Sequence, residues 1–198
     1  LSVFEAVFLL RGRYFKSAIG KESLLKLINE AEVSAQVYNS NAIENSTLSL
    51  EETEKILLQI ELDRYISERE IFETKNLARV VSYIDTKAKE QELTLEIILI
   101  LHKILMANIR DEIAGRVRKA GEWVRVGSHI APNPSQVIEK LTQTFAEYHA
   151  KNHIHIIRRI ARMHLEFEQI HPFVDGNGRI GRVINNYLLI RDGFVPIN

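Results

Sequence analysis

Apolar residues recur at intervals of three and four positions along most of this chain, which is the spacing of one face of an α-helix. Residues 22–38 carry this pattern at Leu24, Leu25, Ile28, Ala31 and Ala35. Ser49 with Glu52, and Ser67 with Glu70, have the spacing of capping boxes, and each pair precedes a further apolar-periodic segment. The pattern therefore predicts a helix over residues 22–38 and helices that begin after Ser49 and after Ser67.

The same periodicity predicts more helices downstream. Thr94 is a candidate N-cap for residues 95–107, which are apolar on nearly every side, so this segment is expected to form a central, buried helix. Further helices are predicted to begin at Asn133-Pro134, to cover residues 154–170, and to run from about Gly178 to Arg191 before the cap position Gly193.

Residues 122–130 interrupt the helical pattern. Trp123, Val124 and Val126 favour a strand, and Gly127-Ser128 has the composition of a two-residue hairpin turn. We therefore predict an all-α fold, a helical bundle with a central buried helix and one short β-hairpin. No linker rich in Ser, Gly or Pro divides the chain, so residues 1–198 are interpreted as one domain.

Composition narrows the function classes. Lys plus Arg and Asp plus Glu each number 26, so the net charge is zero and a broad basic surface for nucleic acid is excluded. The chain has no cysteine, which excludes disulfides, thiolate nucleophiles and Cys-based zinc sites, and fits a reducing compartment. No apolar run has transmembrane length. We expect a cytoplasmic protein without nucleic-acid or membrane partners. It begins with Leu rather than Met, so a trimmed chain is expected, and a C-terminal module can be missing.

The segment 170–183, IHPFVDGNGRIGRV, gathers groups suited to phosphate chemistry. A helix is expected to end before Pro172, and a glycine-rich turn then leads into the N-terminus of the next helix, where backbone N–H groups attract anions. Arg179 and Arg182 are three residues apart, so they are expected to share a helix face and to form a polyphosphate cradle. Asp175 is a suitable Mg²⁺ ligand, and His171 is a candidate proton acceptor.

Each of these features also has an ordinary structural interpretation. A single His before Pro is usually packed or solvated, a Gly-Asn-Gly sequence is usually a turn, and two arginines at this spacing usually form a solvated face. Their combination within one short segment favours the transfer of a phosphate-containing group.

Residues 171–182 resemble the Fic family motif, HPF-x-D/E-GNGR-x-x-R, and match it at every defined position. The resemblance covers most of the chain. Residues 101–105 are similar to the family's central-helix signature, residues 115–118 and 123–127 to its flap and hairpin, and residues 131–134 to the segment after the flap. It implies a Fic-type helical fold with one hairpin and a core over about residues 65–192.

The resemblance also implies residue roles. His171 would deprotonate a target hydroxyl, Asp175 would bind Mg²⁺, and Phe173 would anchor the loop in the core. ATP would be held by backbone N–H groups of Gly176 and Gly178, by Asn177 at the α-phosphate, and by Arg179 and Arg182 at the β- and γ-phosphates. Attack on the α-phosphorus would transfer AMP to a Ser, Thr or Tyr side chain of a target protein and release pyrophosphate. The target would pair with the flap residues Glu122, Trp123, Val124, Arg125 and Val126.

A second resemblance lies in residues 40–45, SNAIEN, which are similar to the family's inhibitory motif S/T-x-x-x-E-G/N. It implies an inhibitory segment at about residues 38–47, with Ser40 and Glu44 in the motif and Glu44 in a bidentate pair with Arg182. Such a pair would remove the arginine that the γ-phosphate needs. The alternative is that Asn41 and Glu44 form a capping box at a helix start.

Several functional alternatives stay open. The donor can be UTP, GTP or CDP-choline instead of ATP, and the same site can remove AMP from a modified target. Gly178 differs from the Lys of the kinase-like Doc branch, which argues against phosphorylation. The chain can also be a non-catalytic nucleotide-binding regulator or a toxin with a separate antitoxin. A homodimer is possible.

Three further residues have structural interpretations. His102 and His164 fall on apolar helix faces, so we expect them to be buried and hydrogen-bonded and not metal ligands. Trp123 is interpreted as a packing residue at the base of the flap, with target contact as the alternative.

Overall fold

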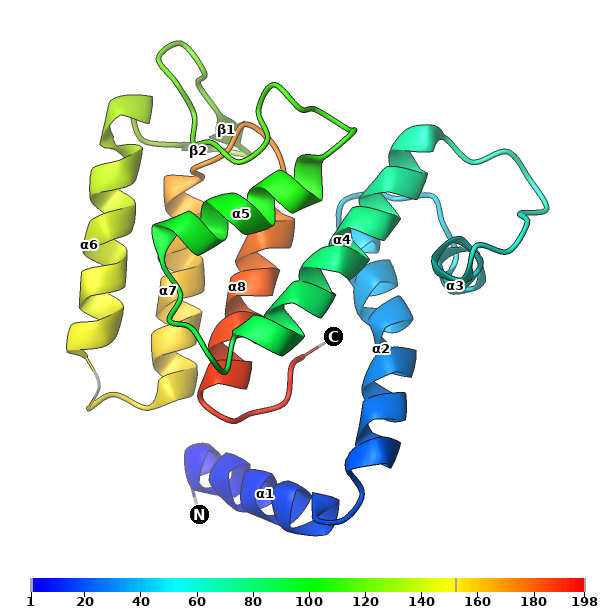
Figure 1. The fold of residues 1–198 in the computed structure, drawn as a ribbon. Coiled ribbons are helices and arrows are strands. Elements are labelled where there is room, and N and C mark those ends of the chain that lie inside the picture. The colour runs from blue at the N-terminus through cyan, green and yellow to red at the C-terminus, as the bar shows by residue number, and fades with distance from the viewer. Residues whose placement is uncertain (1, 152, 198) are drawn as a thin grey trace.

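The computed structural model describes residues 2–151 and 153–197, and its elements are mostly helical (Figure 1). In chain order they are α1 (Val3–Ala18), α2 (Glu22–Ile43), α3 (Leu50–Leu58), α4 (Glu68–Lys87), α5 (Leu95–Met106), β1 (Arg125–Val126), β2 (His129–Ile130), the 3-10 turn η1 (Pro134–Gln136), α6 (Val137–Ala150), α7 (Ile156–Ile170) and α8 (Asn177–Arg191). The prediction of an all-α fold with one short hairpin is confirmed.

Side-chain caps explain where several helices begin. Ser49 and Glu52 form the complete predicted capping box of α3, with the Glu52 amide 3.1 Å from Ser49 Oγ and the Ser49 amide 2.8 Å from Glu52 Oε2. At α4 only half of the predicted box forms. Ser67 Oγ accepts from the Glu70 amide at 3.3 Å, whereas Glu70 Oε1 accepts from the Thr47 amide at 2.9 Å. The Glu70 side chain thereby ties the loop before α3 to the start of α4.

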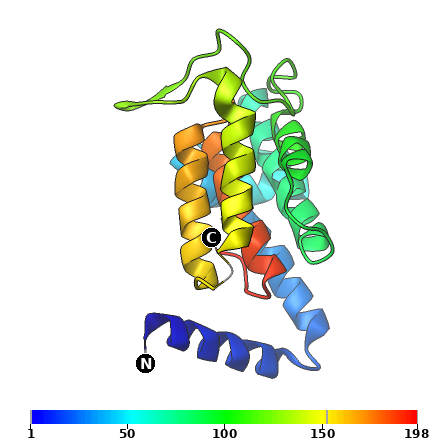
Figure 2. The ribbon, with the colours of Figure 1, turned by 90° about the vertical axis from the view of Figure 1, so that its left-hand side faces the viewer.

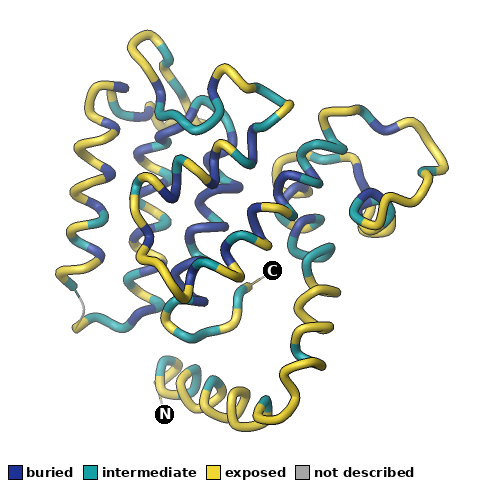
Figure 3. The backbone as a smooth tube through the Cα atoms, in the orientation of Figure 1, coloured by how far each residue is buried: buried dark blue, intermediate teal, exposed yellow. Residues whose placement is uncertain are grey.

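The helices enclose one main hydrophobic core. α4 packs against α5, α6 against α7, and α7 against α8, while α2 contacts both α4 and α8. In Figure 2 α8 lies between the α6–α7 pair and the α4–α5 pair, and Figure 3 shows buried residues along it. Phe167 of α7, Phe173 of the following loop and Tyr187 of α8 are fully buried in this core. A smaller cluster of Leu48, Ile56 and Ile66 packs beneath α3.

The expectation for residues 95–107 holds for one face of α5. Leu101 and Leu105 are fully buried, but Ile100 is 44% exposed. The helix with the most continuous burial is α8, in which every residue from Val183 to Ile190 except Asn185 is buried. The uniformly apolar sequence of α5 therefore belongs to a helix that keeps one side in solvent. The helix at the centre is α8, and its first turns carry the polar residues of the candidate site.

The hairpin is shorter than predicted. Arg125 pairs with Ile130 and Val126 with His129 in antiparallel register, around the turn at Gly127-Ser128. Trp123 lies before β1 and is 61% exposed, so the interpretation of Trp123 as a packing residue at the base of the flap is wrong. An indole in this position contacts mainly solvent.

The first helix was not predicted as an element. Ser2 caps α1 in a capping box with Glu5. Phe8 lies against Phe194, with ring centroids 5.7 Å apart, and Arg11 Nε donates to the Gly193 carbonyl at 2.6 Å. α1 therefore packs on the chain that follows α8. Over residues 2–151 and 153–197, none of the helices combines the length and apolarity that a membrane span requires.

Candidate active site

His171 occupies the C-cap of α7 and has a left-handed backbone conformation, with φ 49°. Its imidazole Nδ1 lies 3.3 Å from the carbonyl oxygen of Glu168, which can only accept a hydrogen bond. This contact favours the tautomer with hydrogen on Nδ1 and leaves Nε2 as the acceptor. Burial lowers the pKa of His171 below the usual imidazole value, and the hydrogen bond to Glu168 offsets this effect only in part. The ring is therefore neutral near pH 7 and able to accept a proton.

Four residues after His171, Asp175 leads into Gly176, which is the N-cap of α8. Gly176 has φ 81°, and no side chain caps the helix here. A Cβ at this position would lie 3.2 Å from Leu105 Cδ2 and 3.3 Å from Met106 Sδ, so both the conformation and the close approach to α5 favour glycine. The Gly176 amide donates to Asp175 Oδ1 at 2.6 Å, so the backbone N–H groups that the first turn of α8 leaves for an anion begin at Asn177.

The side chain of Asn177 holds the loop in shape. It is buried, its Oδ1 accepts from the Phe173 amide at 2.8 Å, and its Nδ2 donates to the Phe173 carbonyl at 2.8 Å. Nδ2 keeps a second hydrogen, so the expectation that this side chain holds the α-phosphate stays a prediction. Phe173 is fully buried and anchors the loop, as expected.

His102 of α5 connects the loop to the flap. Its Nδ1 accepts from the Gly115 amide at 3.0 Å, so Nε2 carries the hydrogen that it donates to the Asp175 carbonyl at 3.0 Å. The ring stacks on Phe173 with centroids 3.7 Å apart, and burial lowers the pKa of His102 to about 4. The interpretation of His102 as a buried, hydrogen-bonded residue is confirmed. His164 is half-buried, and its Nδ1 has no hydrogen-bond partner among the residues that the structure describes.

Arg179 and Arg182 lie on the same turn of α8 but contact different elements: Arg179 points toward α4 and Arg182 toward the end of α2. The guanidinium of Arg179 is buried, 3.4 Å from Glu73 and 3.4 Å from Asp175. Arg69, one turn before Glu73 on α4, lies 3.5 Å from the other oxygen of Asp175. Arg69 and Glu73 thus belong to the site, and the sequence analysis missed them. An Arg and a Glu four residues apart are common on exposed helix faces, and these two belong to no recognised motif, so no signal in the sequence identifies them.

Arg182 contacts the end of α2. Its Nε donates to Ser40 Oγ at 2.9 Å, and its Nη2 donates to the Ser40 carbonyl at 2.9 Å and to Glu44 Oε1 at 2.8 Å. The pair with Glu44 is therefore not bidentate as expected, because only Nη2 bonds the carboxylate, whereas Nε donates to Ser40. Glu44 is the C-cap of α2, so the alternative of a capping box at a helix start is wrong.

The carboxylate of Glu44 lies beside the first turn of α8. A Cβ placed on Gly178 would be 2.5 Å from Glu44 Oε1 and 3.2 Å from Arg182 Nη1. The carboxylate therefore lies beside the helix N-terminus, a position that favours a negative group.

The flap lies over the C-terminal end of α7. His129 Nε2 is 2.8 Å from the Gln169 carbonyl, and the Ala131 amide donates to the Val124 carbonyl at 3.1 Å. Arg125 and Val126 are exposed, whereas Glu122 is engaged in a two-armed pair with Arg116 at 2.7 Å for each oxygen. Glu122, one of the five predicted target-binding residues, thus already has Arg116 as its partner.

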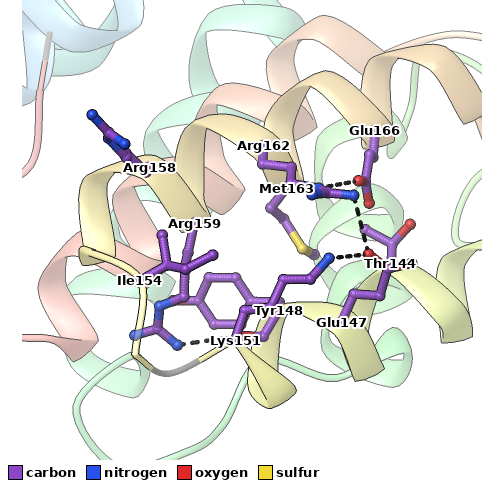
Figure 4. Close-up of a pocket in the computed structure, with 10 residues that line it drawn as sticks. All are labelled: Thr144, Glu147, Tyr148, Lys151, Ile154, Arg158, Arg159, Arg162, Met163 and Glu166. Atoms are coloured by element: carbon purple, nitrogen blue, oxygen red, sulfur yellow. Dashed lines mark hydrogen bonds and ion pairs between the residues drawn. The ribbon is translucent and has the colours of Figure 1, made fainter.

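A cavity of about 220 Å³ lies between α6 and α7, apart from the motif (Figure 4). Four of its charged groups pair with one another: Arg162 lies 3.2 Å from Glu147 and 2.7 Å from Glu166, and Lys151 also pairs with Glu147. None of the motif residues lines it. The candidate site is therefore located by its chemistry and not by this cavity.

Comparisons with known proteins agree with this geometry. The model of the Fic/DOC family matches residues 92–189. A protein adenylyltransferase Fic of Drosophila erecta is 31% identical over 201 residues, covering 93% of this chain and 40% of that protein. A protein of the same name from Nematostella vectensis is 29% identical, covering 94% of this chain and 44% of that protein. This chain thus spans less than half the length of these curated relatives.

Solved structures share the fold. Fic-1 from C. elegans superposes with a TM-score of 0.82 at 27% identity, over 98% of this chain and 57% of that one. A Fic domain containing signaling protein from Bacteroides thetaiotaomicron has a TM-score of 0.84 at 25% identity, over 98% of this chain and 74% of that one. With the matching motif, helices and hairpin, these findings establish that the chain belongs to the Fic/DOC family.

Proposed function

We propose that this chain is a protein adenylyltransferase that moves AMP from ATP to a side-chain hydroxyl of a protein target, and that Glu44 restrains it. The observation that carries the proposal is a neutral His171, with Nε2 left to accept a proton, placed beside the uncapped N-terminus of α8. The names of the relatives at 31% and 29% identity support the same activity.

The proposed reaction is a displacement at the α-phosphorus. The target hydroxyl loses its proton to His171 Nε2 while its oxygen forms a bond to the α-phosphorus. The bond from that phosphorus to the bridging oxygen breaks, and pyrophosphate leaves with the bonding electrons. The protein contributes position and charge stabilisation, which are the main sources of catalysis in phosphoryl chemistry.

Two parts of the site would hold the donor. We expect the backbone N–H groups of Asn177 and Gly178 in the first turn of α8 to face the phosphates, and Arg182 to supply a cation once Glu44 leaves it. The Gly176 amide already donates to Asp175 Oδ1 at 2.6 Å, so it would have to exchange this partner for a phosphate. Arg179 supplies a second cation from the interior, and its pairs with Glu73 and Asp175 fix its direction.

The residues present fit a magnesium ion shared with the donor. Asp175 offers hard carboxylate oxygens, and no cluster of three or more His, Cys, Asp or Glu side chains forms a complete metal site within residues 2–151 and 153–197. The remaining ligands would be phosphate oxygens and water, which is the usual arrangement for Mg²⁺ beside a nucleotide. When bound, the ion would neutralise phosphate charge.

The proposed restraint follows from competition for donors. Glu44 and Ser40 together engage the Nε and Nη2 of Arg182. A γ-phosphate that needs this guanidinium must displace the carboxylate, so ATP binds without the alignment that transfer requires. Removal of Glu44 removes the competing carboxylate and opens the space beside Gly178, while Ser40 keeps its two hydrogen bonds to Arg182.

The test uses the wild-type protein, Glu44→Gly and His171→Ala, each incubated with ATP labelled at the α- or γ-phosphate and then examined by mass spectrometry. Adenylyl groups on protein, retained from the α label and dependent on His171, are the expected result. Label retained only from the γ position would identify a kinase. No nucleotide-derived mass on any protein, despite ATP binding, would favour a non-catalytic regulator.

A further inference from the structure

Arg118 is a charged residue in the interior, only 2% exposed, and it has no carboxylate partner within hydrogen-bond distance among the residues that the structure describes. A buried guanidinium is costly unless its donors are satisfied. Here backbone carbonyls of the His171 turn and of the flap accept hydrogen bonds from the guanidinium.

Four of the five N–H donors of the guanidinium are used. Nε donates to the His171 carbonyl at 2.7 Å, and Nη2 donates to the Ile170 carbonyl at 3.2 Å. Nη2 also donates to the Pro132 carbonyl at 3.0 Å, and Nη1 donates to the Glu122 carbonyl at 3.1 Å. One side chain therefore bonds both the turn that carries the base and the two ends of the flap hairpin.

The contacts at His171 have a clear physical effect. The carbonyls of residues 170 and 171 belong to the C-terminal end of α7, where a helix lacks internal donors and carries a partial negative charge. Arg118 supplies both the donors and the positive charge. It also stabilises a non-glycine residue in the left-handed region, an unfavourable conformation that persists only when neighbours hold it. The Arg118 amide adds a fifth bond, to the Pro172 carbonyl at 2.9 Å.

We infer that Arg118 is the positioning residue that fixes the distance between the target-gripping flap and the catalytic base. This inference rests on the proposed function, because it assigns the flap to the protein target and His171 to proton transfer. The residue does not touch either substrate. It acts by holding the edge of the hairpin and the imidazole in one rigid unit, so that a hydroxyl presented by the flap arrives within reach of Nε2.

Only arginine fits this role. Its planar guanidinium presents donors in several fixed directions, whereas a lysine has three donors on a single nitrogen and cannot reach four separated carbonyls. The charge of Arg118 also helps to lower the pKa of His171, after the larger effect of burial. A variant that loses the hydrogen-bond geometry of Arg118 should therefore lower kcat, whereas a variant that loses its charge should also shift the pKa of His171.

The experiment uses the Glu44→Gly protein as the parent, with Arg118→Lys and Arg118→Gln added singly. Arg191→Gln is the control, because Arg191 also donates to a carbonyl, that of Ala88, but at the opposite end of α8. For each protein one measures the Kd of a non-hydrolysable ATP analogue, the kcat of automodification and its KM for α-labelled ATP, and the pH dependence of that rate.

The expected result is an analogue Kd within about twofold of the parent and a kcat reduced by roughly ten- to a hundredfold in both Arg118 variants, the cost typical of a base misplaced by about 1 Å. The apparent pKa of the base should rise in Arg118→Gln but not in Arg118→Lys, which keeps the charge. Unchanged kcat in both variants would overturn the inference, and so would a loss of analogue affinity parallel to the loss of kcat. A parent that transfers no AMP would instead refute the proposed function.

Amide hydrogen exchange on the unsubstituted chain tests whether Arg118 joins the flap to the His171 turn, even where the variants fail to fold. The Arg118 amide bonds the turn at Pro172, and the Ala131 amide closes the hairpin base at Val124. If one guanidinium joins these segments, the two amides should exchange with the same opening free energy. Exchange at Ala131 faster than at Arg118 by more than about tenfold would show that the flap opens independently, and would overturn the inference.

Discussion

Arg182 and Glu44 meet beside the first turn of α8, with Nη2 of the arginine 2.8 Å from Oε1 of the glutamate. The two residues are 138 positions apart in the chain, and the contact joins the end of α2 to the helix that carries the motif. Under the proposed function, a phosphate would compete with this carboxylate for the same guanidinium.

Replacing Glu44 with glycine should raise the rate of automodification. A hydrogen bond between charged groups contributes about 1.5–3 kcal/mol, which corresponds to a roughly ten- to hundredfold increase in rate if the bond must break before productive binding. Incorporation of α-labelled ATP measures the effect. Glu61→Gly, on the loop after α3, is the matched control and should not change the rate. An unchanged or lower rate in Glu44→Gly would contradict the proposed restraint.

Replacing Ser40 with alanine should relieve inhibition only in part. The hydroxyl accepts from Arg182 Nε at 2.9 Å, but the Ser40 carbonyl and Glu44 keep Nη2 engaged. Loss of one such hydrogen bond, worth about 0.5–1.5 kcal/mol, predicts a roughly two- to tenfold rise in the same assay. In the Glu44→Gly background the additional effect should be smaller, because the carboxylate that competes with the phosphate is already absent. A Ser40→Ala effect as large as that of Glu44→Gly would show that the hydroxyl, and not the carboxylate, dominates.

Replacing Asn177 with alanine should destabilise the fold. The substitution leaves the buried amide and carbonyl of Phe173 without their partners at 2.8 Å, which costs about 2–4 kcal/mol. Urea unfolding followed by circular dichroism measures the change. Asn185→Ala on the same helix is the control, because the structure gives Asn185 Oδ1 no partner among the described residues. Equal losses in the two variants would argue against the loop-holding role of Asn177.

The pH dependence of the rate should report His171. Only the neutral imidazole accepts a proton, so a pKa lowered by burial keeps the base active at more acidic pH. In Glu44→Gly the rate should stay constant down to below about pH 6.5, the ordinary imidazole pKa, and then fall about tenfold per pH unit. The charge of Glu44 raises the pKa of His171, so its removal shifts this limb further toward acid.

Initial rates across about pH 5 to 8 measure this limb, at temperatures where the protein remains folded. His153→Gln, an exposed histidine between α6 and α7, should leave the profile unchanged. An acid limb above the ordinary imidazole pKa would indicate that His171 is stabilised in its charged form, contrary to its buried position.

The sequence by itself determined the helices from α2 to α8, the hairpin and the motif, because the signals for these are local. A Ser three residues before a Glu, an Asn-Pro pair or a glycine turn acts on its immediate neighbours, and the capping of α3 and the turn at Gly127-Ser128 follow the predicted chemistry. The motif residues were likewise contiguous, so their type and spacing were enough to predict phosphate chemistry.

Only the tertiary structure decided which distant groups complete the site. The sequence did not place Glu73 against Arg179, and it did not show that Arg118 uses backbone carbonyls. Every residue has a backbone carbonyl, so the residue type does not indicate which carbonyl accepts a hydrogen bond from Arg118. Arg179 and Arg182 illustrate the same limit. They share one turn, yet one contacts α4 and the other contacts α2, because the direction of a long side chain depends on which helices pack beside it.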